Sequence, residues 1–231
     1  MHGSGVSTGL HGESAYLGRR MQMVSRDRAH PGRAVPVAPE RLHAVLGCLL
    51  TPPYPENCEV AGFAMGCFWG TEQTYWSVSG VVVTAVGYAG GYTPNPTYDE
   101  VLTGMTGHCE TALVVYDPQV VSFVELVKIF FEAHDPTGSM RQGIDLGTHY
   151  RSMIFAPDRV HCVIAEEMRL AYQRALLLEG FGPVRTEIEP LGAFYFAESA
   201  HQQYLARHRD LKTRQRPTGI AFPVDSLPSA D

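Results

Sequence analysis

The sequence predicts an α+β fold, a two-layer sandwich with a mixed central sheet and helices packed on it. Strand and helix patterns follow one another in the order β-α-β-β-α-β-α-β-α. Short apolar or β-branched runs, such as 60–64 and 81–86, are typical of buried strands. After Ser122, apolar side chains fall on one face of a helix. The 231 residues, 45% of them hydrophobic, suffice for one domain with a sizeable core.

The first half of the chain supplies three strands separated by glycine and proline signals. The expected elements are a strand at 60–64, a helix at 71–76, a strand at 81–86, a glycine-rich loop at 87–98, a short helix at 99–103 and a strand at 110–116. Asp117-Pro118 ends the last of these strands, because proline has no N–H to donate to a sheet.

Capping residues mark the helices of the second half. Ser122 and Glu125 form a capping box for a helix that ends before Pro136. Asp158 begins the longest helix, and Gly180 suits its C-cap. The remaining expected elements are an irregular loop at 137–148, a strand at 150–155, a strand at 184–191 and a final helix at 197–208.

Composition divides the chain into one domain with extensions at both ends. Residues 1–28 lack hydrophobic periodicity and are expected to form a disordered leader. The proline-rich residues 29–58 are expected to lie over the domain as an arm, with a short helix at 40–45. Residues 59–209 form the domain that carries the chemistry, and 210–231 form a tail.

Charge and cysteine usage exclude several classes of protein. No apolar run approaches the ~20 residues of a membrane span. The net charge of -6 argues against binding to nucleic acid or anionic lipid. Five scattered cysteines fit a reducing, cytoplasmic location and show no zinc-type spacing, so no metal is expected. No repeat and no second domain is expected. No sequence feature marks the oligomeric state, and a monomer is expected.

Cys67 is the candidate nucleophile because it lies where a strand turns into a helix. The N–H groups and dipole at a helix N-terminus favour thiolate over thiol. Gly66 and Gly70 leave space around the sulfur. Phe68 and Trp69 place two aromatic rings beside it, which suits the binding of a methyl group.

Seven motifs in a fixed order extend this observation over most of the chain. They are GCFWG at 66–70, GYAGGY at 87–92, NPTY at 95–98, GHCE at 107–110, HDP at 134–136, GTHYRS at 147–152 and HQQYL at 201–205. From about residue 30 to residue 206 the chain resembles the type A peptide methionine sulfoxide reductases. The resemblance implies thiol-dependent reduction of methionine S-sulfoxide, free or in proteins, through a sulfenic acid on Cys67. It also implies repair of oxidised proteins.

The resemblance assigns further roles. Glu110 is the expected acid for the sulfoxide oxygen, since desolvation beside an apolar strand raises a carboxyl pKa. Tyr98 and Tyr150 are expected to donate hydroxyl hydrogen bonds to that oxygen. Asp145 is similar to the family's loop aspartate, which orients a hydrogen-bond network, although its neighbour Ile144 stands where asparagine is expected. No cofactor is expected beyond an external thiol reductant, such as thioredoxin or a low-molecular-weight thiol.

The chain departs from many family members in its C-terminal segment, where one or two cysteines usually attack the sulfenic acid. Residues 206–231 contain no cysteine. Recycling by another cysteine, direct reduction by an external thiol, and poor turnover all remain open. Cys48 is the best internal candidate and Cys162 the next, whereas Cys109 points away from Glu110 along a strand. An external thiol is preferred to either.

Two other functions compete with this interpretation. A cysteine hydrolase would use Cys67 with His108 or His134 as its base. A binding module would recognise oxidised methionine with little turnover. A metal site at His108-Cys109-Glu110 is disfavoured, because adjacent strand residues alternate faces and cannot converge on one ion.

Overall fold

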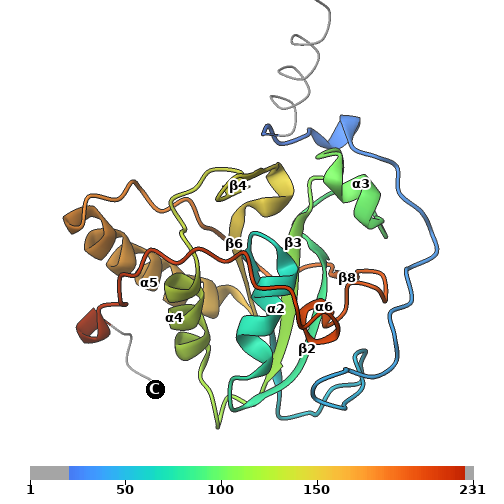
Figure 1. Cartoon of the computed structure of the whole chain (residues 1–231), viewed down its shortest axis with the longest axis horizontal. Coiled ribbons are helices and arrows are strands. Elements are labelled where there is room, and N and C mark those ends of the chain that lie inside the picture. Colours follow the sequence, from blue (N-terminus) through green and yellow to red (C-terminus); the bar gives the residue numbers. More distant parts are fainter. Residues whose placement is uncertain (1–20, 227–231) are drawn as a thin grey trace, which may run out of the picture.

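A six-stranded sheet forms the centre of the computed structural model, which describes residues 21–226 (Figure 1). The strand order is β7-β6-β1-β3-β2-β8. The strands are β1 (Glu59–Met65), β2 (Val81–Ala89), β3 (Cys109–Tyr116), β6 (Ser152–Ala156), β7 (Glu187–Pro190) and β8 (Tyr195–Phe196). Only β6 and β7 pair in parallel, so the sheet is mixed, as the sequence predicts.

Three helices pack on one face of this sheet: α2 (Phe68–Trp76), α4 (Phe123–Ala133) and α5 (Arg159–Leu178). The predicted capping box of Ser122 and Glu125 begins α4, and the Asp158 side chain caps α5. Two short helices, α3 (Tyr98–Leu102) and α6 (Tyr204–Arg207), lie nearer the end of the sheet that carries Cys67. The α+β prediction is confirmed.

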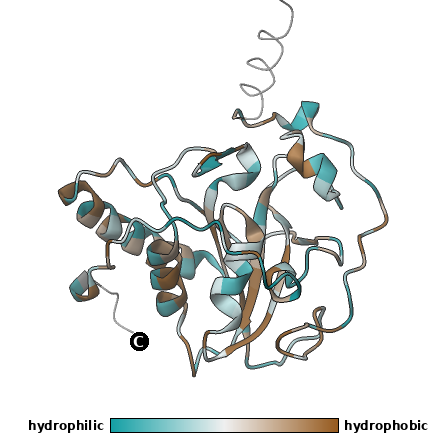
Figure 2. Cartoon of the chain, in the orientation of Figure 1, coloured by the Kyte–Doolittle hydropathy of each residue, from teal (hydrophilic) through white to brown (hydrophobic). Residues whose placement is uncertain are grey.

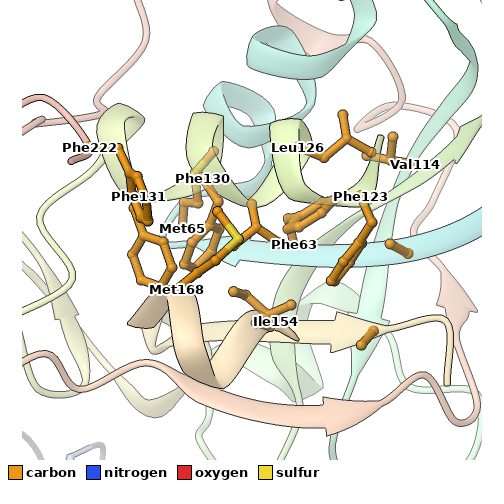
Figure 3. Packing of buried hydrophobic residues seen from close by; sticks show 14 of the residues in the cluster. Phe63, Met65, Val114, Phe123, Leu126, Phe130, Phe131, Ile154, Met168 and Phe222 are labelled. Atoms are coloured by element: carbon orange, nitrogen blue, oxygen red, sulfur yellow. The ribbon is translucent and has the colours of Figure 1, made fainter. Parts of the chain in front are cut away.

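The main core lies between the sheet and these helices (Figure 3). Alternate residues of β1 point into it, and the Phe63 ring stacks on Tyr75 of α2 with centroids 4.6 Å apart. Phe130 and Phe131 of α4 meet Met168 of α5 in the same cluster. This packing fixes α2, and therefore the residue that precedes it, against the sheet.

The proline-rich arm covers the opposite face. Leu50 is fully buried against Val83 and Leu113. At the edge of β2 the arm also reaches the helix side of the sheet, where the His43 ring shares a hydrogen bond of 2.8 Å with the Thr84 hydroxyl and meets Trp76 of α2 edge-on. In place of the helix expected at 40–45, the arm makes turns and an isolated bridge between Leu42 and Leu49.

Several other predicted boundaries were wrong. The loop at 137–148 contains a hairpin of β4 (Arg141–Gln142) and β5 (Asp145–Leu146), followed by the 3₁₀ helix η2 (Thr148–Tyr150). The helix expected at 197–208 is reduced to α6, because Gln203 adopts a left-handed φ of 47°. Of the predicted leader, residues 1–20 lie outside the described residues, and η1 (Arg26–Arg28) follows them.

The predicted tail is part of the folded domain as far as the description extends. In Figure 1 the chain after α6 crosses α2 toward α4 and α5, where η3 (Val224–Ser226) ends the description. The Phe222 ring, 2% exposed, stacks on Tyr172 with centroids 5.7 Å apart. The Tyr172 hydroxyl donates to the Ile220 carbonyl at 2.9 Å. The boundary predicted at residue 209 was therefore wrong. Between residues 21 and 226, no helix is long and apolar enough to span a bilayer.

Replacing Phe222 by alanine is expected to lower the free energy of unfolding by about 3 kcal/mol, because the ring belongs to the main core. Leu211→Ala is the matched control in the same tail, since Leu211 is 45% exposed. The control should change stability by less than about 0.5 kcal/mol. Denaturant unfolding of both variants measures the difference, and equal small effects would contradict the assignment of Phe222 to the core.

Candidate active site

Cys67 occupies the junction between β1 and α2. Gly66 follows β1 with a φ of 88°, and Cys67 is the N-cap residue of α2. The Thr71 N–H and hydroxyl both donate to the Cys67 carbonyl at 3.3 Å. The residue as a whole is partly exposed.

The surroundings of Cys67 favour the thiol over the thiolate. Burial raises the pKa of Cys67 to about 12, and the negative charge of Glu110 adds to the rise. The backbone N–H groups of Trp69 and Gly70 favour the thiolate but do not overcome desolvation. The N–H groups at the helix N-terminus thus favour the thiolate, as the sequence analysis expects, but burial outweighs them.

Glu110 points from β3 into the same site. Because side chains alternate along β3, Cys109 packs with Ala64 and Ala89 on the other face, as predicted. Glu110 is 1% exposed, and its Oε2 accepts from the Phe68 N–H at 3.0 Å. Burial raises its pKa to about 8. Among the described residues its Oε1 has no hydrogen-bond partner, so a protonated carboxyl is left with one oxygen available to a substrate.

The two predicted tyrosines lie near this carboxyl. Tyr98 begins α3, and Tyr150 ends η2. Burial raises the pKa of both phenols, and the charge of Glu110 is the next cause in each. Charges interact strongly only over a few ångströms of partly buried space, so both hydroxyls belong to the environment of Glu110. Both are protonated donors at neutral pH.

Asp145 lies on the rim of the site. Its carboxylate pairs with Arg214 of the tail at 3.2 Å. Its negative charge also contributes to the raised pKa of Glu110. Ile144, which replaces the expected asparagine, is 86% exposed and lines a cavity of about 350 Å³ together with Asp145.

Aromatic rings form the wall beside the sulfur. Phe68 is fully buried, with its ring centroid 6.3 Å from that of Tyr98. The Trp69 ring stacks on Tyr204 at 3.9 Å and on His201 at 5.8 Å. The sequence predicts an apolar surface formed by Phe68 and Trp69. His201 and Tyr204, which belong to the last motif, complete this surface.

Gln142 is a site residue that the sequence analysis missed. Its Oε1 accepts from the Cys67 N–H at 2.8 Å. A Cβ atom on Gly66 would lie 2.5 Å from the Gln142 side chain, so the glycine makes room for Gln142 rather than for the sulfur. No periodicity marks Gln142, because it belongs to a strand of two residues.

The tail also reaches the site, and we call residues 211–216 the strap. The Gln215 side-chain amide contacts the Gln142 amide on one side and the Thr71 hydroxyl, at 3.1 Å, on the other. A Cβ atom on Gly70 would meet the Thr213 hydroxyl at 2.4 Å. The remaining space at Cys67, about 80 Å³, is lined by strap residues, Trp69 and Leu205. The strap therefore covers the nucleophile.

Neither histidine proposed for a hydrolase is available as a base. His108 Nδ1 accepts from the Gly91 N–H at 3.0 Å, and its Nε2 bonds the Thr93 carbonyl at 2.8 Å. The two His134 nitrogens bond the Phe130 carbonyl at 2.7 Å and the Ser152 hydroxyl at 2.8 Å. Both rings serve the fold. In residues 21–226 no group of three His, Cys, Asp or Glu side chains could hold a metal ion.

The candidate resolving cysteines lie at the other end of the sheet. Cys48 Sγ donates to the carbonyl of Val82, near the start of β2. Cys162 follows His161, whose Nε2 is 3.6 Å from the Glu59 carboxylate at the start of β1. The length of β1 separates that end from Cys67, roughly 20 Å at strand geometry. A disulfide needs Cα atoms within about 7 Å, so neither cysteine resolves Cys67 in this fold.

Comparison with known proteins identifies the family. The family model described as peptide methionine sulfoxide reductase matches residues 59–220. The chain belongs to this family. It is 52% identical over 206 residues to peptide methionine sulfoxide reductase MsrA of Brucella anthropi, covering 89% of this chain and 94% of the relative. It is 51% identical over 208 residues to peptide methionine sulfoxide reductase MsrA 1 of Caulobacter vibrioides, covering 90% of this chain and 96% of the relative. These relatives place it in type A of the peptide methionine sulfoxide reductases.

Solved structures of the family share the fold. Methionine sulfoxide reductase A of Corynebacterium diphtheriae superposes with a TM-score of 0.78 at 42% identity, covering 90% of this chain and 100% of that one. Mxr1 from Saccharomyces cerevisiae in its reduced form superposes with a TM-score of 0.65 at 34% identity. The match covers 71% of this chain and 94% of Mxr1. Cys67, Glu110 and the aromatic wall therefore lie on a scaffold that is shared within the family.

Gly66→Ala is expected to lower kcat/KM by about 10²-fold, because its Cβ displaces Gln142 from the Cys67 N–H and shifts the nucleophile. Gly180→Ala is the matched control: its φ of 81° imposes a similar backbone cost, but no atom lies within 4 Å of the added Cβ. Steady-state kinetics and thermal unfolding of both variants separate activity from stability. Equal losses of activity would refute a role for the Gly66–Gln142 contact.

Proposed function

We propose that the protein reduces methionine S-sulfoxide, free or within peptides and proteins, to methionine, and so repairs oxidised proteins. The observation that carries this proposal is Glu110. It is a buried carboxyl with a pKa of about 8 and an oxygen left available, in the same site as a partly exposed cysteine. A poor leaving group such as a sulfoxide oxygen needs a proton, which this carboxyl can supply at neutral pH.

The reaction is a two-electron transfer from Cys67 to the substrate sulfur. The sulfoxide oxygen accepts hydrogen bonds from Glu110 Oε1 and from the hydroxyls of Tyr98 and Tyr150. Glu110 gives its proton to that oxygen while the Cys67 sulfur, losing its own proton, attacks the same oxygen and forms a new S–O bond. The S–O bond of the substrate breaks, methionine leaves as a thioether, and Cys67 keeps the oxygen as sulfenic acid. Glu110 regains the proton that the thiol released.

The aromatic wall supports preference for a methyl sulfoxide. Trp69 and Tyr204 present an apolar surface beside the nucleophile, where the S-methyl group avoids water. The strap must move for a peptide to reach this surface, because the space at Cys67 is only about 80 Å³.

An external thiol then reduces the sulfenic acid. Thioredoxin or a low-molecular-weight thiol attacks the oxidised sulfur and releases water, and a second thiol group releases Cys67 as a thiol. The position of Cys48 and Cys162 at the far end of β1 supports this route. Five free cysteines are consistent with the proposed cytoplasmic location, where thiols stay reduced.

The pH dependence tests the acid. With Cys67 at a pKa of about 12, the thiolate fraction and the rate rise about tenfold per pH unit. Above a pKa of about 8, Glu110 loses its proton and cancels that rise, so kcat/KM should level off near pH 8. In Glu110→Gln, kcat/KM should keep rising through pH 8 without levelling off. The rate should be lower by on the order of 10²–10⁴-fold. If kcat/KM of this variant still levelled off near pH 8, a group other than Glu110 would cause the change of slope.

Trapping of the intermediate tests the recycling step. After one equivalent of a methionine sulfoxide peptide and no reductant, Cys67 should carry one oxygen or one dione adduct by peptide mass spectrometry. Cys67→Ser should carry neither, whereas Cys48→Ser and Cys162→Ser should behave like the unaltered protein. A disulfide peptide containing Cys67 would overturn direct external reduction. Binding of the peptide without any oxidation of Cys67 would favour a binding module instead.

A further inference from the structure

The solvent face of α5 is apolar. Five large aliphatic side chains on it are exposed, and Figure 2 shows brown segments recurring along this helix. They are Val160 (68% exposed), Val163 (59%), Leu170 (44%), Leu177 (56%) and Leu178 (87%). A surface helix normally presents polar side chains to water, so a face of this kind marks a contact with another molecule.

The spacing places three of these residues in one stripe. Val163, Leu170 and Leu177 are seven residues apart, and seven residues fall only about 20° short of two full turns. The core side of α5, which includes Met168 and Tyr172, is about 180° away around the helix. The stripe runs along most of a helix of 20 residues, roughly 30 Å long. Its period is that of a coiled-coil seam.

The tail does not cover the stripe. Phe222 and Ile220 contact α5 through Tyr172, which lies on the core side. The aliphatic residues of the stripe stay exposed with residues 21–226 in place. The covering molecule is therefore not the described part of this chain.

Charge within the stripe selects the partner. Glu167 and Arg174 are both exposed and lie between its aliphatic residues, seven residues apart. If a second α5 packs antiparallel across a two-fold axis at Leu170, that residue meets its own copy and Val163 meets the copy of Leu177. The same register sets Glu167 beside the copy of Arg174, twice per interface. A parallel arrangement in register would instead set Arg169 beside the copy of Arg174, two like charges.

We propose that the outer face of α5 is the interface of a two-fold symmetric homodimer, with the two α5 helices antiparallel. The interface leaves both active sites open, since Cys67 is surrounded by α2, α6, the hairpin and the strap. A single helix–helix contact is smaller than a standard interface, so we expect a dissociation constant on the order of micromolar. This face argues against the monomer expected from the sequence.

Sedimentation velocity of the full chain from about 1 to 200 µM tests the proposal, with the range chosen to bracket micromolar dissociation. The unaltered protein should shift from monomer to dimer, and Leu170→Glu should remain a monomer because two glutamates meet at the axis. Val120→Glu is the matched control, an exposed aliphatic (57%) in a turn away from α5, and should still dimerise. Circular dichroism checks that each variant is folded.

A charge exchange tests the register. Glu167→Arg and Arg174→Glu should each weaken the dimer by at least about tenfold, since like charges then face each other. The double variant should restore the unaltered dissociation constant, because it exchanges the two partners of each pair. A monomer at every concentration would overturn the proposal and leave the face for a different protein. A dimer unaffected by Leu170→Glu, or single variants not rescued by the double, would also overturn it.

Discussion

The pairing of β1 with a strand on each side determines where the reactive groups meet. Phe63 pairs with Ala112 of β3, so Glu110, two residues earlier on that strand, lies opposite the end of β1. Met65 pairs with Ser152 of β6 on the other side, which places Tyr150 at the same end. Cys67 follows two residues after Met65. Since a register shift of one residue would turn Glu110 to the other face, the backbone ladder itself positions nucleophile, acid and donor.

Desolvation dominates the electrostatics of this site. A helix N-terminus contributes a modest stabilisation of an anion, whereas the burial of two ionisable groups side by side disfavours charge on both. The resting site therefore holds a neutral thiol and a neutral carboxyl. A neutral site suits an uncharged ligand, and the phenols of Tyr98 and Tyr150 stay protonated beside it because their pKa values are raised.

Sequence patterns predicted the features that depend on periodicity or local chemistry. Alternation along β3 separated Glu110 from Cys109, and the change from strand to helix located Cys67. Gln142 could not be predicted, because strands of two residues carry no period. The final helix was overestimated because its apolar spacing does not reveal the left-handed turn at Gln203. Cys48 lies far from Cys67 because the arm crosses the sheet at the end where β2 begins, which depends on tertiary packing alone.

The anchoring of the tail has a mechanical consequence for the strap. It is held at one end by α6, which packs on Trp69, and at the other by Phe222 in the core. A strap held at both ends can move away from Cys67 only as a loop, so its displacement is small. Closing over Cys67 again costs little loop-closure entropy. A free C-terminus would search a much larger volume. The sulfur of Cys67 is thus exposed in brief local openings, and full release of its cover requires part of the hydrophobic core to come apart.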